Sequence, residues 1–441
     1  MMLQPKPIKR KVLIITYYWP PSAGAGVQRW LKFAKYLPQF GWEPIIYTPS
    51  NPEPPEIDTS LLNDVPDNLK IIKKPVWEPY ALYKRLTGKD KTGKITHGFL
   101  KEKANASMFE HLSVWIRGNL FIPDARCFWI KPSVRYLTEY LSAQPVDAIV
   151  STGPPHSMHL IALGVKKRLN IPWLADFRDP WTEIDYYHKL KLTHLANRKH
   201  RRLEKAVLTS ADSVLTIGDN LAQSLYRVSK RNITVISNGF DPDDFDFLPV
   251  RPEDSFTLTH IGSLNSDRNP DALWRAIAKL CLEHEPINHN LRLRFVGKTD
   301  ISLKESLSRF GLLNRAAFTP YLPHTEAIKI AASSAALLLL INRTPNHDVI
   351  VTGKVFEYLA SGRPILCIGP ENGESAKIIK QCQAGKVCEY DDEVSMVQAI
   401  KELFNNFENG KNNANQYSIE QYSRKNLTER LSELLNRITS N

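Results

Sequence analysis

Short runs of apolar residues alternate along the chain with segments in which apolar residues recur every three or four positions. In the first half, strands are predicted at 12–17, 44–48, 147–151, 173–176, 213–217 and 234–236, and helices at 27–40, 156–169 and 197–210. In the second half, strands are predicted at 256–261, 293–296, 317–321, 336–341 and 365–368, and helices at 271–282, 303–310, 325–332, 354–360 and 375–383. Strands that alternate with helices in this way form parallel sheets covered on both faces, so the pattern predicts an α/β fold.

A cluster of turn-forming residues divides this alternation into two halves. The residues at 237–242 read SNGFDP, and we place a hinge between two domains there. The length of 441 residues also fits two or three domains. We therefore predict a first domain over 1–238 and a second over 239–415, with a long helical pattern at 419–438 near the end of the chain.

Charge is unevenly distributed between the two halves. Residues 1–238 carry a net charge of +15, and residues 239–441 carry a net charge of −3. An insertion at about 51–130 breaks the alternation and contains a basic stretch, 70–103, in which aromatic residues are interleaved with ten lysines and arginines. A second basic run spans 189–205. Such stretches are typical of a membrane or nucleic-acid surface, but a polar insertion with a few core aromatics would account for them equally well.

Several classes of protein are excluded by what the sequence lacks. The five cysteines form no CxxC pair, so we expect reduced thiols and a cytoplasmic location rather than a disulfide framework or a zinc knot. The apolar start is interpreted as a strand and not as a signal peptide, because Pro20 and Pro21 follow it without a cleavage site. No apolar run in the sequence is long enough to span a bilayer. Asp241-Pro242-Asp243 matches the metal-binding DxD pattern but is interpreted as a turn, so no metal is expected.

Two loops rich in glycine or proline follow strands in the first half. The first reads PPSAGAGVQR over 20–29, where Gly24 and Gly26 would let backbone N–H groups approach a phosphate at a helix N-terminus. This loop is not the dinucleotide-binding motif, because residue 29 is arginine and not glycine. The second loop, STGPPHS over 151–157, places His156 near a helix start, where it either contacts a substrate or merely caps and packs the helix.

Charged residues follow two further predicted strands. Arg178 stands between two carboxylates in ADFRDPW, residues 175–181, and these groups form either a structural ion pair or part of a substrate site. The segment TGKVFEYLASGRP spans 352–364 and predicts a helix that starts at Thr352, Gly353 and Lys354. Phosphates suit the helix N-terminus and Lys354, and Glu357 suits ribose hydroxyls, whereas the alternative is an ordinary capped surface helix.

The order of these segments resembles the glycosyltransferase family 4 group. The resemblance rests on the strand–PPxxG–helix start, DFRDPW, the linker SNGFDPDDF and GKVFEYLASGRPI, and it extends over nearly the whole chain. It implies the GT-B fold, in which two Rossmann-like parallel-sheet domains face each other across a cleft. It also implies an acceptor-binding first domain, a nucleotide-sugar-binding second domain, and a C-terminal helix within 416–441 that packs back on the first domain.

The resemblance further implies where a donor would bind. Glu357 matches the glutamate that the family uses on the nucleotide ribose, while Val349 stands at the position of an earlier family glutamate. Arg268 resembles one member of the basic pair that binds the diphosphate, and Lys354 or Arg343 would supply the other charge. The remaining donor-binding positions are predicted at Gly24, Gly26, Arg29, Gly262, Thr352 and Gly353.

The leading hypothesis is a hexosyl-type glycosyltransferase that uses a nucleotide sugar, retains the anomeric configuration, needs no metal, and serves cell-surface polysaccharide or glycolipid synthesis. Arg268 and Lys354 would stabilise the departing diphosphate. His156, Arg178 and Asp179 would orient the acceptor hydroxyl. A sugar-nucleotide epimerase of the same fold and a catalytically inactive sugar-nucleotide-binding protein remain alternatives, the latter because of Val349.

The expected partners follow from this hypothesis and from the charge distribution. They are a nucleotide-sugar donor and a sugar or lipid-linked acceptor, and no cofactor is expected. We also expect reversible contact between the basic first domain and the anionic inner face of the membrane. A nucleic-acid partner is not expected, because no helix-turn-helix, KH or RRM pattern occurs in the sequence.

Overall fold

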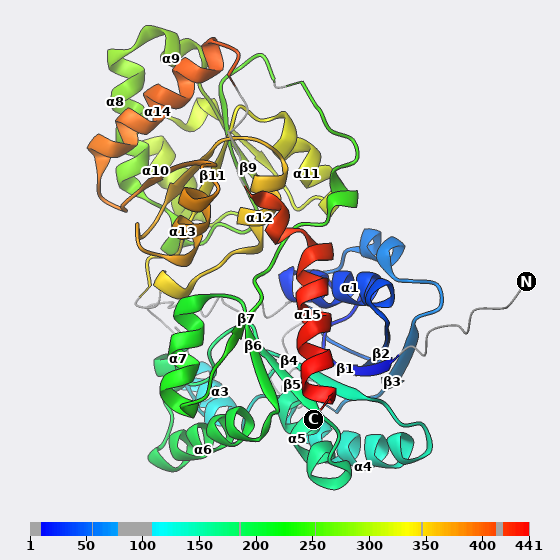
Figure 1. Cartoon of the computed structure of the whole chain (residues 1–441). Coiled ribbons are helices and arrows are strands. Elements are labelled where there is room, and N and C mark those ends of the chain that lie inside the picture. Colours follow the sequence, from blue (N-terminus) through cyan, green and yellow to red (C-terminus); the bar gives the residue numbers. More distant parts are fainter. Residues whose placement is uncertain are drawn as a thin grey trace, which may run out of the picture. The chain divides into compact units, whose positions relative to one another are not determined.

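The computed structural model describes residues 10–54, 56–77, 108–184, 187–251, 253–344, 347–411 and 418–440. The chain divides into two compact units, one formed by residues 1–237 together with 427–441 and the other by residues 238–426. Each unit is built around one parallel sheet with helices packed on it (Figure 1). Most of the basic stretch 70–103 lies outside the described residues.

The first unit contains a seven-stranded sheet in the order β3-β2-β1-β4-β5-β6-β7. Its strands are β1 (Arg10–Ile15), β2 (Trp42–Pro49), β3 (Lys70–Lys74), β4 (Ala148–Gly153), β5 (Trp173–Phe177), β6 (Ser213–Thr216) and β7 (Thr234–Val235). β4 and β5 are buried along their whole length, as expected for strands covered on both faces. The chain order reverses between β1 and β4, and the loops that follow strands at such a switch point form the usual ligand site of an open α/β sheet.

Helices cover both faces of this sheet. They are α1 (Ala25–Tyr36), α3 (Met108–Asn119), α4 (Cys127–Ala143), α5 (Ser157–Leu169), α6 (His194–Ser210), α7 (Asp219–Ser229) and the greater part of α15 (Arg424–Thr439). On one face, Val12 of β1 packs in a cluster with Trp30 of α1 and Leu431 of α15. The neighbouring Leu13 projects to the opposite face, where α5 crosses β1, β4 and β5.

The second unit contains a six-stranded parallel sheet in the order β10-β9-β8-β11-β12-β13. Its strands are β8 (Thr257–Ile261), β9 (Arg292–Val296), β10 (Ala316–Thr319), β11 (Ala336–Leu340), β12 (Ile365–Ile368) and β13 (Gly385–Cys388). Its helices are α8 (Asp271–Glu283), α9 (Glu285–Asn290), α10 (Ile301–Arg309), α11 (His324–Ser333), α12 (Gly353–Ala360), α13 (Glu374–Gln381) and α14 (Glu393–Glu408). The core joins Trp274 of α8, Leu338 of β11 and Phe404 of α14, and the switch point lies between β8 and β11.

The α/β alternation that the sequence predicts is confirmed in both units. The structure adds elements that the pattern did not reveal, among them β3, β13, α3, α4, α7 and α14. The missed strand β3 carries the sequence KIIKK, and lysines of this kind commonly protect the exposed edge of a sheet. Within the described ranges, no helix has both the length and the apolar character that crossing a membrane requires.

Candidate functional site

Predicted residues gather at the carboxyl edge of the first sheet, at its switch point. The loop after β1 leads into α1, the loop after β4 leads into α5, and Arg178 follows β5 directly. Because β1, β4 and β5 are neighbours in a parallel sheet, their C-terminal ends lie side by side. Gly24, with a φ of +118°, precedes α1 in a backbone conformation that favours glycine. The structure thereby brings Gly26, His156 and Arg178 to one edge.

Arg29 lies beneath this edge in a fully buried ion pair with Asp176. Its Nε and Nη2 donate to the two carboxylate oxygens at 3.3 and 3.2 Å, and its guanidinium also donates to the backbone carbonyls of Ile236 and Ser237. Asp176 accepts two further hydrogen bonds, from Trp30 Nε1 at 2.7 Å and from Thr152 Oγ1 at 2.9 Å. The predicted contact of Arg29 with a donor is therefore corrected to a structural role, because its side chain has no exposed surface.

Arg178 occupies the space between the start of α1 and the end of β4. Its Nε donates to Thr152 Oγ1 at 3.1 Å, and its Nη2 donates to the carbonyl of Pro154. A β-carbon at position 26 would lie 1.6 Å from Nη1, so Gly26 is needed for the guanidinium to reach this place. Burial lowers the pKa of Arg178, and the nearby Asp179, which is exposed, opposes that shift.

His156 immediately precedes α5, and its ring stacks on Trp181 with centroids 4.6 Å apart and planes within 3° of parallel. His200 of α6 holds Trp181 in place, because the indole Nε1 donates to His200 Nδ1 at 3.1 Å. The His156 side chain makes no capping hydrogen bond, which argues against the capping interpretation. Burial lowers the pKa of His156 well below its ordinary value, so the ring is neutral at pH 7.

A basic pair lies at the carboxyl edge of the second sheet. Lys354, in the first turn of α12, rests against Gly262 in the loop after β8, where a β-carbon would lie 2.3 Å from Lys354 Cε. Arg268, from the same loop, donates to the carbonyl of Ser263 at 3.1 Å and to the side chain of Asn342. Burial, together with the positive charge of Arg268, lowers the pKa of Lys354 to about 7. Two partly buried cations in this arrangement favour an anion as ligand.

Glu357 lies one turn after Lys354 on α12 and pairs with His324, whose Nε2 is 3.0 Å from Glu357 Oε1. Burial raises the pKa of Glu357, but His324 and Lys354 lower it by more, so the net shift is downward and the carboxylate is ionised at pH 7. Thr352 and Gly353 form the N-terminus of α12. The Oγ1 atom of Thr352 is buried and has no hydrogen-bond partner among the described residues, which leaves it available to a ligand.

Arg343 is engaged elsewhere in the second unit. Its guanidinium forms a two-fold ion pair with Asp391, at 2.9 and 2.5 Å, and both side chains are exposed. Of the two residues predicted to complete the basic pair with Arg268, the structure therefore favours Lys354. Val349 ends a short 3₁₀ helix, His347–Val349, in which Asp348 lies beside it.

His260 belongs to the same edge but was not predicted from the sequence. It is fully buried in β8, and its Nδ1 donates to the carbonyl of Leu338 at 2.9 Å. Its Nε2 is buried and has no partner among the described residues. Burial and the charge of Lys354 lower the pKa of His260 well below its ordinary value, although hydrogen bonding to the backbone of Leu338 and Ser263 opposes that shift, so the ring is neutral at pH 7. The sequence feature that could have identified His260 is a histidine inside the otherwise strand-like run FTLTHI, residues 256–261.

The DxD match lies in a turn, as its interpretation from the sequence required. Asp241 precedes the 3₁₀ helix Pro242–Phe245 and accepts a hydrogen bond from the backbone N–H of Asp243 at 3.3 Å. Capping of this kind explains why aspartate stands at the first position of the motif. Independence from metal stays a prediction.

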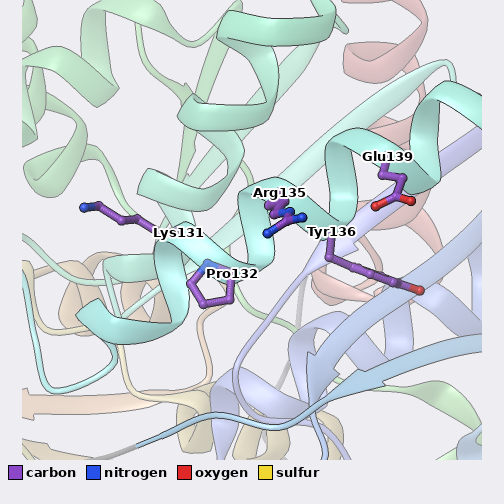
Figure 2. Close-up of a pocket in the computed structure, with 5 residues that line it drawn as sticks. All are labelled: Lys131, Pro132, Arg135, Tyr136 and Glu139. Carbon is purple, nitrogen blue, oxygen red and sulfur yellow. The ribbon is translucent and has the colours of Figure 1, made fainter.

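A groove of about 560 Å³ runs along α4 in the first unit. Figure 2 shows that the side chains lining it come from successive turns of this one helix: Lys131, Pro132, Arg135, Tyr136 and Glu139. We call this feature the α4 groove. Its cations, Lys131 and Arg135, are both exposed.

The edge strand β3 adds further positive charge beside the α4 groove. Lys74 Nζ lies 3.9 Å from the centroid of the Tyr136 ring. Neither Lys74 nor the two groove cations, Lys131 and Arg135, form an ion pair with any described residue. At the start of α4, Phe128 packs edge-to-face against Trp77 at 4.8 Å, and both rings are about half exposed. Part of the basic stretch predicted from the sequence thus lies on a surface that also carries exposed aromatic rings.

The second basic run, 189–205, lies largely on α6. Its cations Lys199, Arg201 and Arg202 are exposed, whereas His200 and Glu204 face the interior and are buried. The cations of this run therefore form the solvated outer face of an amphipathic helix.

The role of Glu357 can be tested by replacing it with glutamine, which has the same shape but no charge. Glu357→Gln is expected to raise the donor KM about tenfold, because a hydrogen bond to a charged group contributes about 1.5–3 kcal/mol and the amide keeps the shape but loses the charge. Steady-state kinetics with varied donor measure this change. Glu326→Gln, an exposed position on α11, is the matched control and should leave KM unchanged. A wild-type donor KM in Glu357→Gln would remove this residue from the donor site.

Comparison with known families identifies the class of protein. The chain has the two-sheet architecture of a GT-B glycosyltransferase, and models of two glycosyltransferase families match it in succession. The model of Glycosyltransferase Family 4 matches residues 95–244, and the model of Glycosyl transferases group 1 matches residues 255–406. The chain belongs to the glycosyltransferase family 4 group, which confirms the resemblance inferred from the sequence. No curated protein sequence matches the chain.

Solved structures share the fold over nearly the whole chain at low sequence identity. Sucrose-phosphate synthase from Thermosynechococcus elongatus has a TM-score of 0.60 at 12% identity, covering 98% of this chain and 100% of the other. WaaG, a glycosyltransferase involved in lipopolysaccharide biosynthesis, has a TM-score of 0.55 at 14% identity, covering 96% of this chain and 99% of the other. A variant of S. aureus TarM in complex with fondaparinux, α-GlcNAc-glycerol and UDP has a TM-score of 0.60 at 11% identity, with coverages of 97% and 100%. The GT-B fold predicted for the chain is thereby confirmed.

Proposed function

We propose that this glycosyltransferase moves a hexosyl group from a nucleoside-diphosphate sugar to an acceptor hydroxyl. The observation that carries the proposal is the arrangement at the carboxyl edge of the second sheet. Arg268 and Lys354 supply two positive charges, and Glu357 stands one helical turn away as an ionised carboxylate. This spacing suits a ligand that has a diphosphate next to a ribose. The UDP bound to the TarM variant, a fold neighbour, is a ligand of that chemistry.

The chemistry follows from where charge develops. The bond between the anomeric carbon and the diphosphate oxygen breaks, and a bond from that carbon to the acceptor oxygen forms. The departing diphosphate gains negative charge in the transition state and takes the proton of the acceptor hydroxyl. Arg268 and Lys354 stabilise that charge, with help from the backbone N–H groups at the N-terminus of α12. In this scheme the configuration at the anomeric carbon is retained, and no protein base or metal ion is required.

We assign the acceptor to the edge of the first sheet. Arg178 and His156 offer hydrogen-bonding groups there, and the exposed Asp179 can accept a bond from a sugar hydroxyl. Gly24 and Gly26 keep the backbone at the start of α1 open to a ligand. The proposed place in metabolism is the assembly of a cell-surface polysaccharide or glycolipid.

Turnover assays with candidate nucleotide sugars test the proposal against its alternatives. A transferase releases nucleoside diphosphate only when an acceptor is added, and chelation of divalent metals should leave its rate unchanged. An epimerase would change the sugar while it remains on the nucleotide. An inactive binding protein would bind the nucleotide sugar without any product.

We further propose that the first unit attaches reversibly to an anionic membrane surface through the α4 groove. Lys74, Lys131 and Arg135 form no ion pair with described residues, and exposed aromatic rings flank them. Each basic residue near an anionic surface contributes about 1 kcal/mol, and aromatic rings suit the interface. A lipid-linked acceptor would then be presented at the surface to which the enzyme is bound.

Charge reversal tests this attachment. The triple variant Lys74→Glu, Lys131→Glu, Arg135→Glu is expected to weaken binding to anionic vesicles about 100-fold or more, since about 3 kcal/mol of attraction is removed. Co-sedimentation with anionic and neutral vesicles measures binding, and high salt should weaken it by screening. The control variant reverses three exposed cations of the second unit, Arg251, Lys329 and Lys411. Equal binding of wild type to neutral and anionic vesicles would contradict the proposal.

A further inference from the structure

A line of polar groups runs through the interior of the first unit toward His156. The indole Nε1 of Trp173 donates to Ser151 Oγ at 2.8 Å, and the same oxygen lies 2.8 Å from Nδ1 of His159. Trp173, Ser151 and His159 have no exposed surface. His159 and His156 lie close together at the start of α5, with ring centroids 5.8 Å apart. Buried polar groups of this kind must satisfy one another, so their donors and acceptors can be worked out.

The hydrogen-bond pattern fixes the position of the proton on His159. An indole N–H can only donate, so Ser151 Oγ accepts from Trp173 and still has its own proton to give. Among the described residues, the only acceptor available to that proton is Nδ1 of His159. Burial lowers the pKa of His159 to about 3, so its ring is neutral and has a single proton. Because Nδ1 accepts, this proton is on Nε2.

Two buried ring nitrogens near Gly153 are left without partners among the described residues. His159 Nε2 and His156 Nδ1 are both buried, and neither has a hydrogen-bond partner among the described residues. Both lie beside Gly153, where a β-carbon would be 2.6 Å from His159 Nε2 and 3.2 Å from His156 Nδ1. His159 Nε2 carries a proton, so it needs an acceptor. His156 Nδ1 can accept only if His156 has its own proton on Nε2.

We propose that His159 is a positioning residue that selects the tautomer of His156. The Nε2–H of His159 bonds through one water molecule to the bare Nδ1 of His156, and the His156 proton is thereby held on Nε2. Nδ1 is buried, while His156 as a residue is 7% exposed, so we assign the contact with a substrate to Nε2. His156 therefore presents a hydrogen-bond donor to a substrate oxygen and does not act as a base.

A second contact keeps the His156 ring in the plane that this requires. Trp181 stacks on His156 within 3° of parallel. The Trp181 indole donates to His200 Nδ1, so His200 has its proton on Nε2, which points to the carbonyl of Gly118 at 3.4 Å. The stack on Trp181 fixes the plane of the His156 ring, and the hydrogen bonds through Ser151 and His159 fix which of its nitrogens is protonated.

Nitrogen NMR of the free protein tests the tautomer without any substrate. Histidine labelled with ¹⁵N distinguishes a protonated from a bare ring nitrogen in long-range proton–nitrogen correlation spectra, and His156→Gln assigns the signal of His156. We expect wild-type His156 and His159 both to be protonated on Nε2. His159→Phe keeps a ring but removes the donor, so His156 should become a mixture of tautomers. Ser151→Ala should release the constraint on His159 and shift the His156 pattern in the same direction.

Kinetics provide the second readout. His159→Phe is expected to lower kcat about tenfold with the donor KM unchanged, as is typical when a residue that orients a functional histidine is lost. Ser133→Ala, which removes another buried serine hydroxyl, is the matched control and should change neither the His156 spectrum nor kcat. A wild-type His156 protonated on Nδ1, or a His156 pattern unchanged in both variants, would overturn the proposal. The inference rests on the proposed function only for the substrate contact, so the spectra remain decisive even if no transfer activity is found.

Discussion

Replacing Lys354 with alanine is expected to lower kcat about 100-fold, and Arg268→Ala should do the same. In the proposed mechanism both side chains stabilise the charge that the departing diphosphate gains, and loss of one such preorganised donor costs about 10²–10³-fold in other enzymes. The fold should be intact, because neither residue forms an ion pair with any described residue, so the substitution strands no partner charge in that part of the chain. Single-turnover measurements at saturating donor isolate this step from binding. If both variants retained the wild-type kcat, leaving-group stabilisation would have to come from other residues.

Lys354→Arg separates the charge of this residue from its pKa. In the protein without a bound donor, Lys354 has a pKa of about 7, so its positive charge is present below pH 7 and is lost above it. Donor kcat/KM in the wild type should therefore fall as pH rises through about 7, because a bare amine does not attract the diphosphate. Arginine stays charged throughout this range, so the fall near pH 7 should disappear in Lys354→Arg. An identical pH profile in the two proteins would show that another group titrates.

The largest expected effect on stability comes from Asp176. Asp176→Ala should destabilise the first unit by about 3–5 kcal/mol, because it leaves the fully buried Arg29 without its counter-charge. Trp30 and Thr152 would lose an acceptor at the same time. For a unit of this size the loss corresponds to a fall in Tm of about 10 °C, measurable by calorimetry.

An exposed ion pair supplies the control for this experiment. Arg251 and Asp254 lie 3.1 Å apart with side chains 86% and 91% exposed. Asp254→Ala should change stability by less than about 0.5 kcal/mol, since exposed pairs contribute little. Similar losses for Asp176→Ala and Asp254→Ala would show that the buried pair does not hold the unit together.

The parts of the site that could be predicted from the sequence are those fixed by local chain order. Parallel sheets expose binding residues where their strands end. Each predicted strand that is followed by Gly24–Gly26, by His156 or by Arg178 therefore places those residues at the carboxyl edge of the sheet. Lys354 and Glu357 were predictable in the same way, because they begin one helix at a fixed spacing. The assignment of roles to these residues came from their chemistry together with the family resemblance, and it awaits the variants above.

The parts that could not be predicted depend on contacts between distant segments. Arg29 follows a glycine loop, as a ligand-binding residue would, but its partner Asp176 stands 147 positions later and draws it into the interior. The partner of Glu357, His324, comes from a different helix, and no local pattern links the two. β3 was hidden because its lysines obscure the apolar signal of a strand that has only one neighbour in the sheet.

Binding of nucleoside diphosphates tests the central claim most directly. Calorimetric titration with UDP, GDP, ADP and TDP should find at least one that binds saturably to the wild-type protein, and the same nucleotide should raise its Tm. The double variant Arg268→Ala, Lys354→Ala should lose this binding, whereas His156→Gln, in the other unit, should retain it. No binding by any nucleoside diphosphate, or equal binding by wild type and the double variant, would contradict the assignment of the second sheet edge as the donor site.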